Sequence, residues 1–252
     1  MFYLIGLGLK PTHLTMEALE IIKECDSVFL ENYTSEYSEG FIKDLAQLIQ
    51  RDIIALNRKE VEENFKSALI SATKNKIALL VFGNPLTATT HLQLLLDAKE
   101  IGVKTKVLPG ISITNMITQT GLDEYKFGRI VTICFHEEGF EPDSFYEQIK
   151  KNQSIGLHTL CLLDIKKETK LKKMMSCPQA IEVLEKIAKS KNEEINFEYI
   201  AILAMASEKQ KIIYGKKKIL GDKEVDEMFP QSLIVIGKTN EKEKEALNKF
   251  FS

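Results

Sequence analysis

The chain has 252 residues, of which 44% are hydrophobic, and this is enough apolar material to bury the core of one large domain or two smaller ones. Its 34 Lys and Arg residues are balanced by 36 Asp and Glu residues, so the net charge of −2 excludes the positive field of a dedicated nucleic-acid binder. The longest apolar runs fall far short of the roughly 20 residues that cross a bilayer. The first residues also lack a signal peptide's features, so we expect a cytoplasmic protein with no membrane partner.

Strands and helices alternate through the first half of the chain. Apolar runs predict strands at residues 2–6, 28–30, 53–56, 77–82 and 103–108, and helical patterns occupy about 15–25, 41–49, 59–74, 90–101 and 113–120. Thr15 is expected to cap the first of these helices with its hydroxyl. Because strands separated by helices need crossover connections, this half predicts a mainly parallel sheet with helices on both faces.

The pattern changes after residue 121. Strands are predicted at residues 129–135, 157–165, 199–206, 210–215 and 233–236, with helices near 145–151, 179–190 and 241–250. The short polar turn at residues 207–209 predicts an antiparallel hairpin, so the second sheet should be mixed. We therefore predict two α/β domains, an N-terminal one at residues 1–121 and a C-terminal one at residues 122–252.

The four cysteines are widely spread and form no C-x-x-C pair: Cys25, Cys134, Cys161 and Cys177. A disulfide framework would need an oxidising compartment, and metal ligation would need tighter spacing. The histidines also lack the spacing of zinc ligands, and no G-x-S-x-G motif marks a serine nucleophile. We therefore expect buried reduced thiols and no metal.

Ligands of parallel sheets bind at the carboxyl ends of the strands, where this sequence has loops at residues 6–8, 83–85 and 109–110. A dinucleotide fingerprint fails because Pro11 stands where its third glycine is needed, and this favours a ligand without phosphate. Residues 84–91 (NPLTATTH) form the densest polar cluster of the chain. They either contact a ligand or merely cap a helix through Thr89 or Thr90, and Ser112 has the same two interpretations.

Four strings resemble the diphthine synthases: residues 2–9 (FYLIGLGL), 83–91 (GNPLTATTH), 121–128 (GL and YKFG) and 157–166 (LHTLCLLDIK). The resemblance runs in the same order to Gly237 and implies the two-domain tetrapyrrole-methylase fold. It also implies a homodimer and a methyl donor, S-adenosylmethionine, bound in the cleft between the domains and released as S-adenosylhomocysteine. The implied acceptor is the aminocarboxypropyl-modified histidine of translation elongation factor 2. Residues 161–163 and the C-terminal Phe250 and Phe251 look like the eukaryotic branch, which implies a trimethylated arm amine and a methyl ester on the arm carboxylate.

The family's donor-binding positions fall on eight residues of this chain: Leu9, Asn84, Thr87, Ser112, Ile113, Leu163, Ala206 and Gln231. The resemblance implies that the apolar members pack against the adenine and the methionine chain, and that the polar members bind the ribose and amino-acid groups, as a small-molecule cleft requires. The chain departs from the family pattern at three positions. Asn84 replaces the usual Asp, Met205 the usual Arg and Gln231 the usual His.

Two classes of function follow from these observations. The first is a methyltransferase whose catalysis depends on proximity, with no single acid or base identified. The second is a degenerate, non-catalytic scaffold that binds the donor or the elongation factor, which the three departures would allow. Methylation of a tetrapyrrole or of ribosomal RNA shares the fold, but residues 88–91 and 126–128 match the diphthamide enzyme instead.

Overall fold

The computed structural model describes residues 1–168 and 171–251 and divides into two compact units. Unit 1 comprises Met1–Ile113 with Lys167–Lys170, and unit 2 comprises Thr114–Lys166 with Leu171–Ser252. The boundary expected between residues 121 and 122 lies slightly further along the chain than this division.

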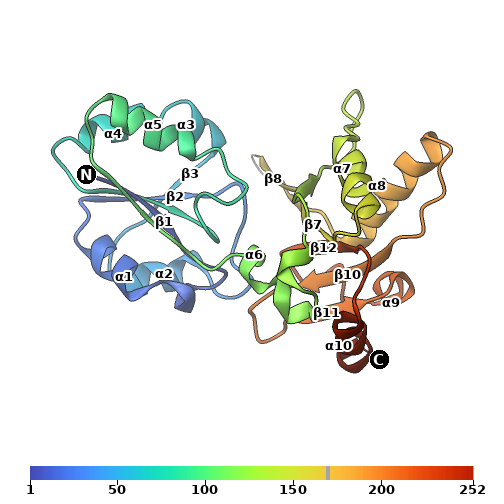
Figure 1. Cartoon of the computed structure of the whole chain (residues 1–252). Helices are drawn as coiled ribbons and strands as arrows, with labels where there is room; N and C mark the ends of the chain where they lie inside the picture. Colours follow the sequence, from blue (N-terminus) through green and yellow to red (C-terminus); the bar gives the residue numbers. More distant parts are fainter. Residues whose placement is uncertain (169–170, 252) are drawn as a thin grey trace. The chain divides into compact units, whose positions relative to one another are not determined.

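A five-stranded parallel sheet forms the centre of unit 1, in the order β3-β2-β4-β1-β5 (Figure 1). Its strands are β1 (Phe2–Gly6), β2 (Ser27–Glu31), β3 (Ile54–Leu56), β4 (Ile77–Val81) and β5 (Thr105–Leu108). In the centre of the sheet, Ile5 lies between Leu80 on β4 and Leu108 on β5. The predicted parallel sheet is confirmed.

Helices cover both faces of this sheet (Figure 1). One face carries α1 (Met16–Lys23) and α2 (Ile42–Ile49), and the other carries α3 (Arg58–Glu62), α4 (Lys66–Ser71) and α5 (Leu92–Glu100). Because side chains alternate along a strand, Tyr3 and Ile5 pack toward α1 and α2, while Phe2 and Leu4 pack toward the other three helices. A short 3₁₀ helix, η1 (Pro11–His13), precedes α1.

Two local expectations for unit 1 have different outcomes. Thr15 does cap α1, since its Oγ1 accepts a hydrogen bond from the Ala18 N–H at 3.1 Å. The single helix predicted at residues 59–74 is wrong, because the chain forms α3 and α4 with a break between them. The break brings the ring of Phe65 to within 5.8 Å of Phe2 and 5.6 Å of Phe29, measured between ring centroids, so core packing overrides helical propensity there.

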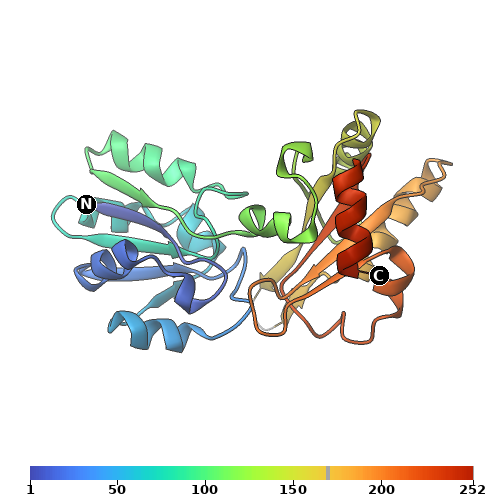
Figure 2. The ribbon, with the colours of Figure 1, turned by 60° about the horizontal axis from the view of Figure 1, so that its bottom comes forward.

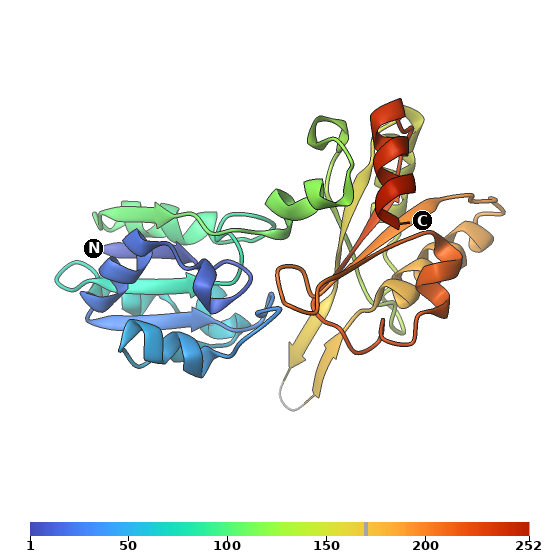
Figure 3. The ribbon, with the colours of Figure 1, turned by 90° about the horizontal axis from the view of Figure 1, so that it is seen from below.

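Unit 2 contains a mixed sheet, as predicted, and its strand order is β11-β10-β12-β7-β6. Its strands are β6 (Val131–Ile133), β7 (Thr159–Leu163), β10 (Glu198–Leu203), β11 (Lys211–Tyr214) and β12 (Gln231–Ile236). Only β6 and β7 are parallel, and the predicted hairpin is the antiparallel pair β10 and β11. The single strand predicted at residues 157–165 is wrong, since β7 ends at Leu163 and a two-stranded sheet of β8 (Ile165–Glu168) and β9 (Leu171–Met174) follows (Figure 3).

Three helices of unit 2 contribute to the apolar core on its sheet, namely α7 (Ser144–Ser154), α8 (Cys177–Ser190) and α9 (Lys216–Gly221). The unit also contains α10 (Glu241–Phe251) and, earlier along the chain, α6 (Ile113–Met116), η2 (Ile117–Thr120) and η3 (Glu124–Lys126). Figure 2 shows α10 beside the rest of its unit, where Leu247 is buried. Helix α9 was not predicted, because its three lysines face solvent and only Ile219 is buried.

The four cysteines are free, and three of them are buried, as expected. Cys134 is the exception and is partly exposed. Burial raises the pKa of the Cys25 thiol to about 11, so this thiol is unreactive at neutral pH. Within residues 1–168 and 171–251, no cluster of three or more His, Cys, Asp or Glu side chains is arranged to hold a metal ion, and no helix is long and apolar enough to cross a membrane.

Candidate active site

Three backbone segments meet at the carboxyl ends of β1, β4 and β5. A Cβ atom on Gly6 would lie 2.5 Å from the nitrogen of Gly110 and 2.7 Å from the carbonyl oxygen of Gly83. Gly8 and Gly83 exchange two hydrogen bonds, of 3.2 and 2.9 Å between nitrogen and oxygen. Only glycine permits so close an approach, so the loops that follow these three strands begin side by side.

The directions in which these loops leave the sheet also indicate a binding site at the carboxyl ends of β1 and β4. Strands β1 and β4 are neighbours, but α1 follows β1 on one face of the sheet and α5 follows β4 on the other (Figure 1). Ligands of α/β sheets bind outside the carboxyl ends at such a switch point. This edge is therefore the candidate site of unit 1.

Five of the eight predicted donor-binding residues lie on these loops: Leu9, Asn84, Thr87, Ser112 and Ile113. The Oδ1 atom of Asn84 accepts a hydrogen bond from the Leu86 N–H at 3.2 Å, but no described residue accepts one from its Nδ2. The Thr87 hydroxyl also has no partner in the part of the chain that the structure describes. The loop therefore presents two hydrogen-bonding groups that a ligand could use.

His13 supports the loop after β1. Its Nδ1 lies 3.4 Å from the backbone nitrogen of Leu9 and accepts that N–H. Burial, together with the positive charge of Lys10, lowers the pKa of His13, so the ring remains a neutral acceptor. His13 therefore has a structural role in this loop.

The polar loop of residues 84–91 is held from inside the protein. His91 is buried, with an exposed fraction of 2%, and its Nδ1 lies 3.0 Å from the carbonyl oxygen of Pro85. Its Nε2 lies 3.9 Å from the Oε2 of Glu31, a fully buried carboxylate at the end of β2. Thr34 donates to both oxygens of this carboxylate, through its N–H at 2.7 Å and its hydroxyl at 2.5 Å. The sequence analysis missed Glu31, although a charged residue that ends an apolar strand is a signal for such a role.

The helix-capping interpretation of this loop is wrong. Helix α5 begins at Leu92 with His91 at its N-cap, and no side chain caps it. The Thr89 hydroxyl instead donates to the carbonyl oxygen of Pro85 at 2.7 Å, and the Thr90 hydroxyl lies 3.5 Å from Glu62. The threonines therefore shape the loop rather than start the helix.

Three of the five described non-glycine residues with a positive φ angle lie in the predicted site loops. They are Ala88 in the loop just described and Ala204 and Ala206 after β10, with φ values of 55°, 43° and 71°, whereas the other two, Gln50 and Asn192, lie just after helices α2 and α8. Such angles are costly for residues with a Cβ and tend to persist where function or the surrounding structure requires them. Ala206 is itself one of the eight predicted residues, and its N–H donates to the Oε1 of Gln210 at 2.8 Å.

The other three predicted residues lie in unit 2, at the end of the sheet where β7 and β10 end and β12 begins. Leu163 ends β7, Gln231 begins β12, and Ala206 follows the end of β10. Because β12 is antiparallel to both β7 and β10, its first residue lies beside the last residues of these strands. The structure thus brings the eight residues together as two groups, one at a sheet edge in each unit.

Gln231 has a structural role in unit 2 that its sequence position did not reveal. Its Oε1 accepts the N–H of Cys177 at 2.7 Å, at the first residue of α8. Its Nε2 donates to the carbonyl oxygens of Val225 and Met228. The side chain therefore ties the start of α8 to the segment that precedes β12.

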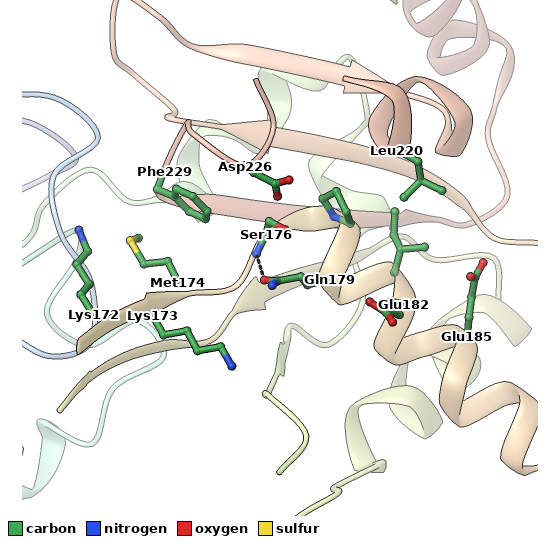
Figure 4. Close-up of a pocket in the computed structure, with 12 residues that line it drawn as sticks. Lys172, Lys173, Met174, Ser176, Gln179, Glu182, Glu185, Leu220, Asp226 and Phe229 are labelled. Carbon is green, nitrogen blue, oxygen red and sulfur yellow. Dashed lines mark hydrogen bonds between the residues drawn. The ribbon is translucent and has the colours of Figure 1, made fainter. Parts of the chain in front are cut away.

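These two elements form walls of a cavity of about 800 Å³ in unit 2 (Figure 4). Ser176 and Gln179 line it from the start of α8, Asp226 and Phe229 from the segment before β12, and Met174 from β9. None of the eight predicted donor-binding residues is among the described residues that line it. Gln231 does not line this cavity, but its hydrogen bonds connect the two segments that form these walls.

A second buried network, also missed by the sequence analysis, fixes the start of α10. Its centre is Glu243, whose carboxylate is buried. Burial raises the pKa of this carboxyl, but hydrogen bonds outweigh burial and lower it to about 2. The donors are the Nζ of Lys126, the Nε2 of His158 and the N–H groups of Asp123 and Asn240.

His158 completes this network as a neutral imidazole. Its Nδ1 accepts the N–H of Gly237 at 2.9 Å, so its hydrogen is on Nε2, which lies 2.9 Å from Glu243. Burial lowers the pKa of His158, although the hydrogen bond to Glu243 opposes this. The strings around residues 126 and 158 thus connect the start of unit 2 to α10.

Comparisons with known proteins agree with this fold. The family described as Tetrapyrrole (Corrin/Porphyrin) Methylases matches residues 1–218. A solved diphthine synthase superposes with a TM-score of 0.86 and 28% sequence identity, covering 100% of this chain and 96% of that one. The chain therefore belongs to the tetrapyrrole methylase family.

Two of its relatives indicate which group of this family the chain belongs to. The diphthine methyl ester synthase of Yarrowia lipolytica is 37% identical over 254 residues, which cover 94% of this chain and 84% of the relative. The diphthine synthase of Methanocaldococcus jannaschii is 33% identical over 251 residues, which cover 98% and 97%. Within the family the chain is thus one of the diphthine synthases, the methyltransferases of diphthamide biosynthesis.

Proposed function

We propose that the protein transfers methyl groups from S-adenosylmethionine to the aminocarboxypropyl arm on a histidine of translation elongation factor 2. The observation that carries this proposal is the similarity to diphthine synthases over nearly the full chain. Fold alone would leave the acceptor open, since one fold hosts many activities. We also propose that the protein is a cytoplasmic homodimer, as the family resemblance implies, and light scattering would test its mass in solution.

The residues present fit the proposed donor. Asn84 and Thr87 offer an amide Nδ2 and a hydroxyl that no described residue uses, which suits ribose hydroxyls or an amino-acid group. Leu9, Ile113, Leu163 and Ala206 supply apolar surface for the adenine and the methionine chain. Gln231 would act indirectly, since backbone groups of its own unit use its amide.

The proposed chemistry asks little of acids and bases in the protein. S-adenosylmethionine carries its methyl group on a sulfonium sulfur, so it supplies an already activated group when bound. The protein must then hold the acceptor in line and exclude water, and such positioning can contribute about 7–11 kcal/mol. The acceptor amine must be unprotonated when it attacks, and we assign no residue of this chain to remove its proton.

The eukaryotic-like strings favour the methyl ester as the final product. We propose that the arm amine becomes a trimethylammonium group and that the arm carboxylate becomes a methyl ester. The 37% identity to the fungal methyl ester synthase supports this choice.

Mass spectrometry of elongation factor 2 tests the proposal directly. Factor that carries the unmethylated arm is incubated with the protein and isotopically labelled S-adenosylmethionine. We expect a series of labelled products on the modified histidine, with one methyl group released by mild alkali because esters hydrolyse and methylammonium groups do not. Transfer only to a tetrapyrrole or to ribosomal RNA, or no transfer at all, would contradict the proposal.

The non-catalytic scaffold has no observation in its favour. Asn84 keeps a hydrogen-bonding side chain at the site, Gln231 is fully bonded within unit 2, and Met205 is buried. Calorimetry with S-adenosylmethionine separates the two alternatives further, because the enzyme must bind the donor.

A further inference from the structure

We infer that His91 is a positioning residue that holds the loop of residues 84–90 in its ligand-binding conformation through its hydrogen bond to Pro85, with Glu31 beside the other nitrogen of the ring. This inference rests on the proposed function, because it assigns that loop to the methyl donor. It concerns two residues outside the eight predicted donor-binding positions.

The hydrogen bonds of the ring define its role. The Nδ1 of His91 faces the carbonyl oxygen of Pro85 at 3.0 Å. A carbonyl oxygen can only accept, so Nδ1 carries a hydrogen and donates it. Pro85 directly follows Asn84, and its carbonyl oxygen also accepts the Thr89 hydroxyl at 2.7 Å. The carbonyl oxygen of Pro85, near the start of the loop, thus accepts hydrogen bonds from Thr89, near its end, and from the buried ring of His91.

Glu31 lies beside the other nitrogen of the ring. Its Oε2 is 3.9 Å from the Nε2 of His91, beyond hydrogen-bonding distance, and its carboxylate is fixed by the N–H groups of Tyr33 and Thr34, at 2.9 and 2.7 Å from Oε1. A ring flip would turn the Nδ1–H away from Pro85, so the hydrogen bond to Pro85 defines the orientation of the ring. The end of β2 therefore closes the buried side of the ring that holds the loop after β4.

The same geometry excludes His91 as a general base. A base must come within hydrogen-bond reach of the proton that it removes. Both ring nitrogens face groups of the protein, and the exposed fractions of the His91 and Glu31 side chains are 2% and 0%. No acceptor amine could reach either nitrogen while the loop keeps this conformation.

The loop needs such support because its backbone is strained. Ala88 has a φ of 55°, a region that residues with a Cβ rarely occupy. Without the bond to Pro85, the loop can relax to unstrained conformations that move Asn84 and Thr87 apart. We therefore expect removal of the ring to weaken donor binding rather than to stop chemistry.

Three substitutions at one position separate positioning from catalysis. In His91→Asn, the side-chain Nδ2 takes the place of the ring Nδ1 and can still donate to Pro85. In His91→Gln the amide corresponds to Nε2, and in His91→Ala no donor remains. We expect the dissociation constant for S-adenosylhomocysteine, measured by calorimetry, to rise about tenfold in the Gln and Ala variants, as loss of one hydrogen bond implies, and less than threefold in the Asn variant.

Amide hydrogen exchange of the ligand-free protein supplies a readout independent of activity. We expect faster exchange within residues 84–90 in the Gln and Ala variants and near-normal exchange in the Asn variant. His136→Ala is a matched control, because His136 makes the same type of bond in unit 2, where its Nε2 lies 3.0 Å from the carbonyl oxygen of Pro142. It should leave both donor affinity and exchange of this loop unchanged.

Two results would overturn the inference. If all three variants lost turnover while their donor affinity and loop exchange stayed normal, His91 would act in chemistry. If all three lowered the melting temperature equally and left affinity and loop exchange unchanged, its role would be general stability. Failure of the proposed function is a separate outcome, since the unmodified protein would then bind no S-adenosylhomocysteine although the exchange pattern could still hold.

Discussion

Individual residues decide the shape of the site in unit 1. Gly6 and Gly110 allow three loops to start in contact, because a Cβ on either residue would lie less than 3.0 Å from neighbouring backbone atoms, and Gly83 has a positive φ of 69°. The sequence indicated these positions, because each glycine follows a predicted strand. It could not indicate the contact between Glu31 and His91, because these residues come near each other only after β2 and β4 pair.

Because the backbones are so close at Gly110, adding a single methyl group there should strongly lower the free energy of unfolding. In Gly110→Ala, the new Cβ would overlap the carbonyl oxygen of Gly83, whereas nothing lies within 4 Å of a Cβ on Gly221. We expect the first substitution to lower the free energy of unfolding by about 3 kcal/mol, at the upper end for overpacking, because both neighbours are backbone. Gly221→Ala should change it by less than about 0.5 kcal/mol. Equal urea denaturation midpoints for the two variants would refute the close approach.

Asn84 should matter for the donor more than for stability. Asn84→Ala removes the unused Nδ2 and the bond to the Leu86 N–H, so we expect about tenfold weaker binding of S-adenosylmethionine by calorimetry. Asn75→Ala removes an exposed amide that bonds only within its own helix end and serves as the control. Unchanged affinity in Asn84→Ala would remove this residue from the donor site.

Secondary-structure elements were predictable where apolar spacing was regular. The parallel strands of unit 1 and the β10–β11 hairpin follow from it. The pattern failed at β8 and β9, which are rich in lysine and have few apolar residues to show alternation. It also could not reveal the network that holds α10, since His158 and Glu243 are 85 residues apart in sequence.

This network gives α10 a specific dependence on pH. The folded pKa of Glu243 is about 2, below its ordinary value of 4.5, so its stabilising effect is complete above pH 4.5 and is lost as the pH falls toward 2. We expect Glu243→Gln to lower the free energy of unfolding at pH 7, by about 3 kcal/mol for a broken buried pair, and the deficit to shrink below pH 4.5. Urea unfolding measured from pH 7 to pH 3 checks this.

The control for this prediction is Glu194→Gln, which alters an exposed carboxyl. It should leave the pH dependence of unfolding unchanged. A deficit in Glu243→Gln that stayed constant down to pH 3 would show that the charge of Glu243 does not stabilise α10.

The start of α8 depends on Gln231 in a comparable way. Gln231→Leu keeps the approximate volume but leaves the Cys177 N–H and the Met228 carbonyl without their partner, so we expect a loss of about 1–3 kcal/mol in the free energy of unfolding. Exchange of the amides at residues 225–229, beside the cavity of unit 2, should also accelerate. Gln47→Leu, at an exposed position, should do neither. If the two variants were equally stable, the hydrogen bonds of Gln231 would not support these walls.

At the scale of the whole molecule, the pattern of strands and helices in the sequence is enough to infer the fold class. The reaction is inferred instead from membership of the diphthine synthases. Physical reasoning from the sequence reached two α/β domains and a ligand without phosphate. The eight predicted donor-binding positions came from the family resemblance, and they lie in two groups, one at the ends of strands in each unit. Their joint use by one donor remains a prediction.

Amide hydrogen exchange of the full chain with and without S-adenosylhomocysteine tests that prediction most directly. We expect protection at residues 6–9, 83–91 and 110–113 in unit 1 and at the ends of β7 and β10 in unit 2. Protection confined to the cavity beside α8, or no protection at these five segments, would contradict the assignment of the donor site.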